Sequence, residues 1–189
     1  MYQTNLTQAN IEKIFRTNFL NCMNDYGLEN IPLLQHYDYV KKGKRDVAVY
    51  FTIQNPRKVG NAYRTYNVED DKANHKEQQH YEATIQLTMI SDEDKTEIAP
   101  LDLAMITSNI IGSLPFIEAM RKQGIGVQSA TDIKTNNVLD EADNFVLECS
   151  LSFQITFNRE LAINNTKVTT KTNLTDNELN TSKSGIFRI

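Results

Sequence analysis

FVLECSLSFQITFN, residues 145–158, alternates large apolar side chains with mainly polar ones over its whole length. Successive side chains of a β-strand point to opposite faces of a sheet, so the alternation predicts one long strand with one buried face. The stretch from Phe145 to Phe157 would span about 40 Å at the usual rise of a strand. The fold is therefore predicted to be built on a sheet that is apolar on one face only.

Further strands with the same period surround this one. Residues 47–53 and 81–89 alternate in the same way, and residues 127–135 form a weaker strand. The stretch 136–144, rich in Asn and Asp, is a natural hairpin connection to the long strand. A short additional strand is possible near residues 63–68.

The first predicted helix covers about Thr7 to Tyr26, where apolar residues recur at spacings of three and four. Thr7 is a plausible N-cap, and Leu6 and Ile11 have the spacing of a hydrophobic staple. Gly27 suits the position after the helix end.

The second helical segment is Pro100 to Gln123, with Gly124 after its end. Its predicted apolar face carries Leu103, Ile106, Ile110, Leu114, Ile117 and Met120. Pro115 inside it removes a backbone hydrogen bond and clashes with the preceding turn. We therefore expect two helical pieces, with a kink or a restart after Ser113.

These elements predict an α+β fold, a two-layer sandwich. Its sheet is expected to be mostly antiparallel or mixed, with four to five strands and two main helices on one face. The core domain is expected to cover residues 1–160. Residues 69–80, EDDKANHKEQQH, are predicted to be a solvated loop or the tip of a long hairpin.

Residues 161–189 are predicted to form a C-terminal arm. Residues 164–184 contain five Asn and six Thr, too few apolar groups for a core of their own. The chain closes on Gly185-Ile186-Phe187-Arg188-Ile189, whose apolar residues could dock on a partner.

The composition gives no support for binding to nucleic acid or membranes, or for secretion. The 189 residues carry a net charge of -4, which supplies no global attraction for nucleic acid or anionic lipid. No apolar run reaches the roughly 18 residues of a membrane span, and the first ten residues lack the pattern of a signal peptide. We expect a protein that stays in the cytoplasm where it is made.

The residues able to carry chemistry do not form a site. Cys22 and Cys149 lie on apolar faces, where a thiol behaves as a small hydrophobe. His36, His75 and His80 have no neighbouring nucleophile pattern.

Other polar clusters have ordinary interpretations. His75 and His80, with Asp70, Asp71 and Glu77, match no zinc spacing. Asp92-Glu93-Asp94 and Asp140-Glu141-Ala142-Asp143 are acidic turns without the features of a calcium loop. Gly124-Ile125-Gly126 is a helix stop, since a third glycine is missing. Lys41-Lys42-Gly43-Lys44-Arg45 could touch phosphates, but a charged turn that protects a strand end is the favoured interpretation. No catalytic, cofactor-binding or metal-binding residue is predicted, so the chain is not expected to be an enzyme.

The order of these features resembles the tail terminator and neck proteins of long-tailed bacteriophages. The resemblance covers about Leu6 to Asn158. It rests on the N-terminal helix, the strand start at 80–87, the helix entry Asp102-Leu103-Ala104, the exit Gly124-Ile125-Gly126-Val127 and the strand 145–157.

The resemblance implies a virion protein, made in the host cytoplasm, that forms a ring, usually of six copies. Such a ring caps the tail tube and joins it to the head connector, and DNA passes through it without sequence-specific binding or any membrane contact. Two other hypotheses stay open: a cytoplasmic ferredoxin-like module that binds a ligand on the polar sheet face, and a hydrolase with an unrecognised site, for which the residues give least support.

Overall fold

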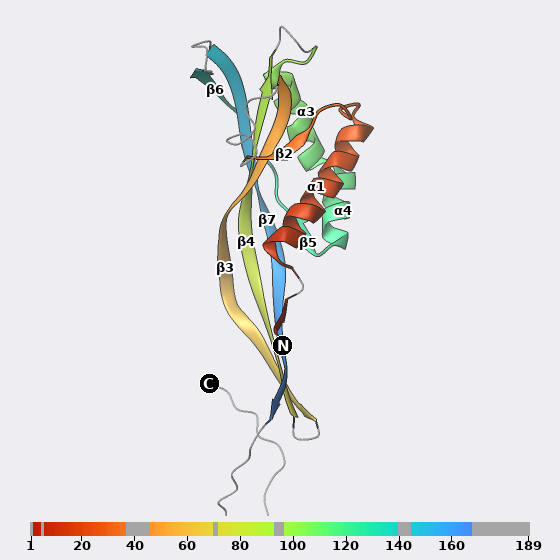
Figure 1. Cartoon of the computed structure of the whole chain (residues 1–189), viewed down its shortest axis with the longest axis vertical. Coiled ribbons are helices and arrows are strands. Elements are labelled where there is room, and N and C mark those ends of the chain that lie inside the picture. The colour runs from red at the N-terminus through yellow and green to blue at the C-terminus, as the bar shows by residue number, and fades with distance from the viewer. Residues whose placement is uncertain are drawn as a thin grey trace, which may run out of the picture.

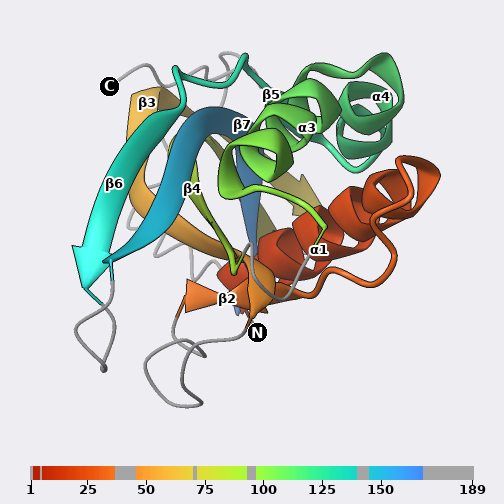
Figure 2. The same cartoon turned by 90° about the horizontal axis from the view of Figure 1, so that it is seen from above.

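The computed structural model describes residues 2–4, 6–36, 46–69, 72–92, 97–139 and 145–167. Its elements are β1 (Tyr2–Thr4), α1 (Gln8–Asp25), β2 (Leu33–Gln35), β3 (Val47–Glu69), β4 (Lys72–Ser91), α3 (Pro100–Gly112), α4 (Leu114–Lys122), β5 (Ile125–Val127), β6 (Lys134–Leu139) and β7 (Phe145–Lys167). The strands β3, β4 and β7 form a long twisted sheet, and the helices cover one face of its upper half (Figure 1). Seen from above, all three helices lie on the same side of the sheet (Figure 2). The α+β prediction is confirmed.

The long strand β7 organises the sheet. It pairs antiparallel with β4 along one edge, and with β6, β5 and β1 in turn along the other. Strand β3 pairs antiparallel with β4, and β2 pairs parallel with β3, so the sheet is mixed. The described residues form seven strands instead of the predicted four to five. The difference arises because β1, β2 and β5 have three residues each, which is too short for a visible period.

The main core lies between the helices and the sheet. Phe15 of α1 is at its centre, with ring centroids of Phe51, Phe116 and Phe153 at 5.2, 6.3 and 6.0 Å. Leu151, Phe153 and Ile155 of β7 are buried on this face, as their alternation predicts.

The opposite face is not polar throughout. Ala48, Tyr50 and Ile90 are buried there in a second small cluster against Leu34. The prediction that each strand is apolar on one face only is therefore wrong at the upper end of β3 and β4.

Helix α1 has the predicted ends. The Thr7 side chain accepts a hydrogen bond from the Asn10 backbone N–H at 3.2 Å, which satisfies one of the first free donors of the helix. Gly27, with φ of 75°, follows the C-cap residue in the left-handed conformation that glycine adopts at little cost.

The second helical segment is broken at Ser113, as Pro115 predicts. The axes of α3 and α4 differ by 53°. Ser113 ends one helix and begins the next: its Oγ donates to the Ile110 carbonyl at 2.7 Å and accepts from the Phe116 N–H at 3.4 Å. The prediction that Leu114 lies on the apolar face is wrong, because α4 starts there on a new axis. Phe116 faces the core instead, and Leu114 is 65% exposed.

The predicted strand over residues 127–135 is interrupted. Val127 pairs with Ile155, and Lys134 pairs with Ser150. The segment therefore advances by seven residues between these two pairs, whereas β7 advances by only five. The two extra residues cannot stay in register, and β5 and β6 are consequently separate strands. The antiparallel pairing of β6 with the start of β7 confirms the predicted hairpin, but the predicted connection 136–144 is too long, because residues 136–139 belong to β6.

The polar segment 69–80 is the tip of a long hairpin, one of the two predicted alternatives. Strand β3 continues to Glu69, and β4 begins at Lys72. Strand β7 continues beside β4 to Lys167, so residues 161–167 of the predicted arm are part of the sheet. The remainder of that arm lies outside the described residues.

Candidate assembly surface

The two cysteines are separate members of the core. Cys22 lies on α1 and Cys149 on β7, and both thiols are buried. Burial raises the pKa of the Cys22 thiol, and the Asp25 carboxylate raises it further. Burial also raises the pKa of the Cys149 thiol. Both shifts reduce the thiolate fraction that a nucleophile or a metal ligand needs.

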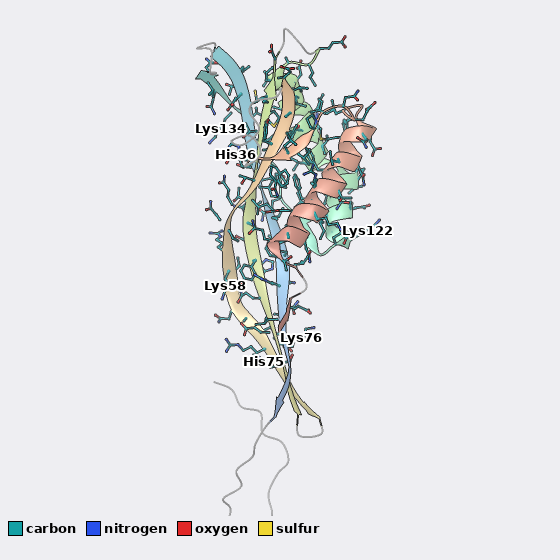
Figure 3. The ribbon with its side chains drawn as sticks, viewed as in Figure 1. His36, Lys58, His75, Lys76, Lys122 and Lys134 are labelled. Carbon is teal, nitrogen blue, oxygen red and sulfur yellow. The ribbon has the colours of Figure 1, made fainter. Side chains whose placement is uncertain are left out.

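The histidines do not converge. His36 follows β2, whereas His75 lies far down β4 (Figure 3). His80 is on the face of β4 opposite to that of His75, and its Nδ1 lies 2.9 Å from the Asn158 Oδ1. In the described part of the chain no group of three or more His, Cys, Asp or Glu side chains could hold a metal ion.

The remaining predicted clusters divide between described and undescribed residues. The stretches 41–45, 70–71, 93–94 and 140–143 lie outside the described residues. Gly124, with φ of 79°, follows the last turn of α4 and is the predicted helix stop. A Cβ at Gly126 would lie 2.5 Å from the Thr156 Oγ1, so this glycine allows β5 to approach β7 closely.

The most unusual feature of the molecule is the part of the sheet that extends below the helices (Figure 1). We call it the blade, and it comprises residues 58–69 of β3, 72–80 of β4 and 158–167 of β7, with β1 on one edge. The stacked rings of Tyr81 and Phe157, with centroids 5.7 Å apart, mark the end of the core above it. Ten residues of β7 below Phe157 correspond to a length of about 33 Å.

The blade is held by backbone pairing and polar contacts. None of the described apolar side chains of the blade is buried. The buried side chain among its described residues is the polar Gln79. Arg64 and Glu77 lie 3.4 Å apart on the helix side, and Lys76 and Glu160 lie 3.0 Å apart on the other. Exposed pairs of this kind each contribute only about 0.2–1 kcal/mol. The blade therefore has little stability of its own from apolar burial.

Gln79 organises the irregular part of β3 in the blade. The register of β3 against β4 shifts between Val59 and Tyr63, where Gly60 has φ of 67°. The Gln79 Nε2 donates to the carbonyls of Val59 at 3.0 Å and Gly60 at 3.3 Å. The buried amide thus satisfies carbonyls that the bulge removes from the ladder.

The middle of the helix-free face above the blade carries neutral polar side chains, between the Arg57–Glu82 ion pair on its blade side and Lys134 and Glu148 further up. Nine Ser, Thr and Gln side chains from three strands alternate there with the core residues: Thr52, Gln54, Thr84, Gln86, Thr88, Ser150, Ser152, Gln154 and Thr156. We call this set the neutral face. The Gln54 Nε2 donates to the Gln86 Oε1 at 2.8 Å across it. Such a surface gives no electrostatic attraction for phosphates.

One sheet edge is open. Strand β2 covers β3 only at Val49–Phe51, and no other described strand pairs with the outer edge of β3. A register shift between Gln54 and Arg57, the φ of 52° at Asn55, and Pro56 interrupt this edge. Bulges and proline are common devices against uncontrolled strand addition. Regular backbone pairing is available over the short stretch Thr52–Gln54.

The local sequence pattern does not identify the blade as a surface. Its signal was the polarity of residues 69–80, which indicates exposure, but polarity does not give the length of a hairpin. The register with β7 decides that length, and long-range pairing is not visible in a local pattern.

No single helix among the described residues has both the length and the apolar character that crossing a membrane requires. The bent pair α3 and α4 meets these criteria only when its two halves are taken together.

The model of a known protein family matches most of the chain. The family model described as E217 gateway protein gp29 matches residues 10–167. These residues include α1 from its third residue, α3 and α4, the strands from β2 to β7 and the blade. None of the curated proteins matches the chain.

Proposed function

The chain belongs to the E217 gateway protein gp29 family, a family of phage structural proteins, and on this premise we propose that it forms a ring at the head–tail junction. In this proposal the ring, of six copies, caps the tail tube and joins it to the head connector, which is the tail terminator or neck role. The protein is made in the host cytoplasm, becomes part of the virion and acts without catalysis. Family membership favours this hypothesis over a ligand-binding module.

The observation that carries the proposal is the blade. A three-stranded extension of about 33 Å whose described side chains bury no apolar group is costly to order in an isolated subunit. Its exposed faces and edges become useful when a neighbouring subunit or ring covers them. The blade is therefore proposed as the main contact with adjacent components.

The open edges of the sheet support ring formation. The outer edge of β3 lies on one side of the sheet, and β6, β5 and β1 lie on the other. If the β3 edge of one copy contacts the opposite edge of the next copy, the interface is heterologous. Successive heterologous contacts form a closed ring when the rotation between neighbouring copies is a whole fraction of a full turn.

The rest of the proposal concerns the division of the chain and the passage of DNA. Residues 1–160 are proposed to form the ring core, with residues 161–167 adding the last part of the blade. The residues after Lys167 are proposed to act as an arm that contacts a neighbouring subunit. DNA is proposed to pass the ring without sequence-specific binding, which the neutral face would permit.

A nonsense allele of this gene in the phage that encodes it tests the proposal. Under restrictive conditions we expect filled heads and complete tails that are not joined, seen by electron microscopy. Addition of the purified protein to such a lysate should restore joined particles. Normal particles without the protein, or tails that are missing altogether, would contradict the proposed place of action.

A further inference from the structure

The open stretch of β3 at Thr52–Gln54 lies beside two hollows under α1. The first, of about 250 Å³, is lined by Gln8, Glu12, Gln35 and His36 together with Phe51–Ile53. The second, of about 200 Å³, lies next to it and shares Gln8 and Ile53. An unpaired strand edge beside a side-chain pocket is the arrangement that peptide recognition by strand addition uses.

The second hollow is suited to an apolar side chain. Its walls include Leu6, Ile11, Tyr81, Ala83 and Phe157, and Arg159 and Gln8 supply the polar groups. A cavity of about 150 Å³ with aliphatic and aromatic walls can hold a benzene molecule. The hollow beside Ile53 is large enough for one phenyl ring by this comparison.

We propose that the segment Gly185–Ile189 of a neighbouring copy adds a short strand to β3 at Thr52–Gln54 and places Phe187 in the second hollow. This inference rests on the proposed ring and identifies the place where the arm docks. Phe187 is the only aromatic residue after Phe157 in the sequence. The added strand would have three paired residues, the same length as β1, β2 and β5.

Chain length and direction are consistent with this docking. Strand β7 ends at Lys167 at the far end of the blade, and residue 153 of β7 lies in the same row as Ile85 and Ile53. The distance back from residue 167 to this row is about 45 Å, and the eighteen residues 168–185 can extend over about 60 Å. Strands β7 and β3 run in the same direction, since both are antiparallel to β4, so a returning segment runs antiparallel to β3.

Antiparallel pairing of the segment with β3 determines the face of the sheet to which each of its side chains points. With Phe187 opposite Ile53, it points to the helix side and into the hollow. Ile186 and Arg188 then point to the neutral face, beside Gln54 and Thr52. Phe187 is consequently the anchor, and its two neighbours contribute little.

A labelled peptide of residues 181–189 provides the test. The acceptor is the full chain with Phe187→Asp, which disables its own segment. We expect saturable binding by fluorescence anisotropy, weakened at least about tenfold when the peptide carries Phe187→Ala. Peptides with Ile186→Ala or Arg188→Ala should bind within about threefold of the original.

Variants of the acceptor locate the site. Ile53→Lys places a charge in the hollow and should abolish binding, whereas Gln54→Lys on the opposite face of the same strand should not. Gln8→Trp, at an exposed position on the first turn of α1, should also block the hollow, and it keeps the test valid if Ile53→Lys fails to fold. No saturable binding, or equal binding to Ile53→Lys or Gln8→Trp, would overturn the proposal.

A disulfide test shows which copy supplies the segment. Gln54→Cys and Ile186→Cys in one chain should link two or more chains on oxidation, because directly opposite residues have Cβ atoms close enough for a disulfide. A link within single chains, or no link, would overturn docking on a neighbour. Ring formation is measured separately by solution mass, so failure of the docking and failure of the proposed function are distinguishable.

Discussion

Phe153 packs β7 against the helical layer. It is 1% exposed, and its ring lies against that of Phe15 of α1. Truncation would leave a cavity between two layers that are fixed by other contacts. We expect Phe153→Ala to lower the free energy of unfolding by about 3–5 kcal/mol in urea denaturation.

The adjacent residue is the matched control for that substitution. Gln154 is exposed on the opposite face of the same strand, and Gln154→Ala should change the stability by less than about 0.5 kcal/mol. Similar losses for the two variants would show that the face assignment of β7 is wrong.

The reactivity of the two cysteines gives a second test. Because burial raises the pKa of both thiols, the thiolate form of each is scarce in the folded state at neutral pH. A folded-state pKa above the unfolded value means that the neutral thiol stabilises the fold below the unfolded pKa. This contribution is lost as the pH rises through the folded pKa.

The expected result is slow alkylation of Cys22 and Cys149 by iodoacetamide at pH 8 in the native protein, and rapid alkylation of both in urea. Mass spectrometry of the intact chain counts the modified thiols. Rapid modification of either cysteine without denaturant would show an accessible thiol and reopen the question of a chemical role.

At the scale of elements, the blade and the core should differ in local stability. Residues 83–90 and 149–157 pair beneath the helices, whereas the described side chains of the blade bury no apolar group. Hydrogen exchange should therefore be faster in peptides from 58–80 and 158–167 than in the paired strands above, by about tenfold or more in the free subunit.

The assembled state is the control for this measurement. Protection of the blade should increase when the chain is in a ring or joined to other components, and the core should change little. Equal protection of blade and core in the free subunit would mean that the blade is a rigid part of the monomer, which would remove its rationale as an assembly surface.

Local sequence patterns predict the structural features that neighbouring residues determine. The cap at Thr7, the break at Ser113 and the buried face of β7 follow from side-chain types at fixed spacings. The strands β1, β2 and β5 and the length of the blade follow from pairing between distant segments, which leaves no local signal. The burial of Tyr50 and the exposure of Leu114 depend on tertiary packing, so the sequence pattern assigned both incorrectly.

The assembled protein is not expected to bind duplex DNA tightly. The proposed ring of six chains, each with a charge of -4, would have a net charge of -24, and the nine side chains of the neutral face carry no charge. We expect no binding to duplex DNA tighter than the roughly 10⁻⁴–10⁻⁶ M of non-specific contacts, measured by anisotropy at about 150 mM salt. Binding clearly tighter than about 10⁻⁶ M under these conditions would contradict passive passage of DNA.

Ring formation is tested by the mass of the purified full chain in solution, measured by sedimentation velocity over a series of concentrations. The chain has a mass of 21.6 kDa, so a six-membered ring has a mass of about 130 kDa. We predict this species, or a stacked multiple of it, with closed rings visible by negative-stain electron microscopy. A monomer or dimer throughout the concentration series, without larger closed particles, would contradict ring formation.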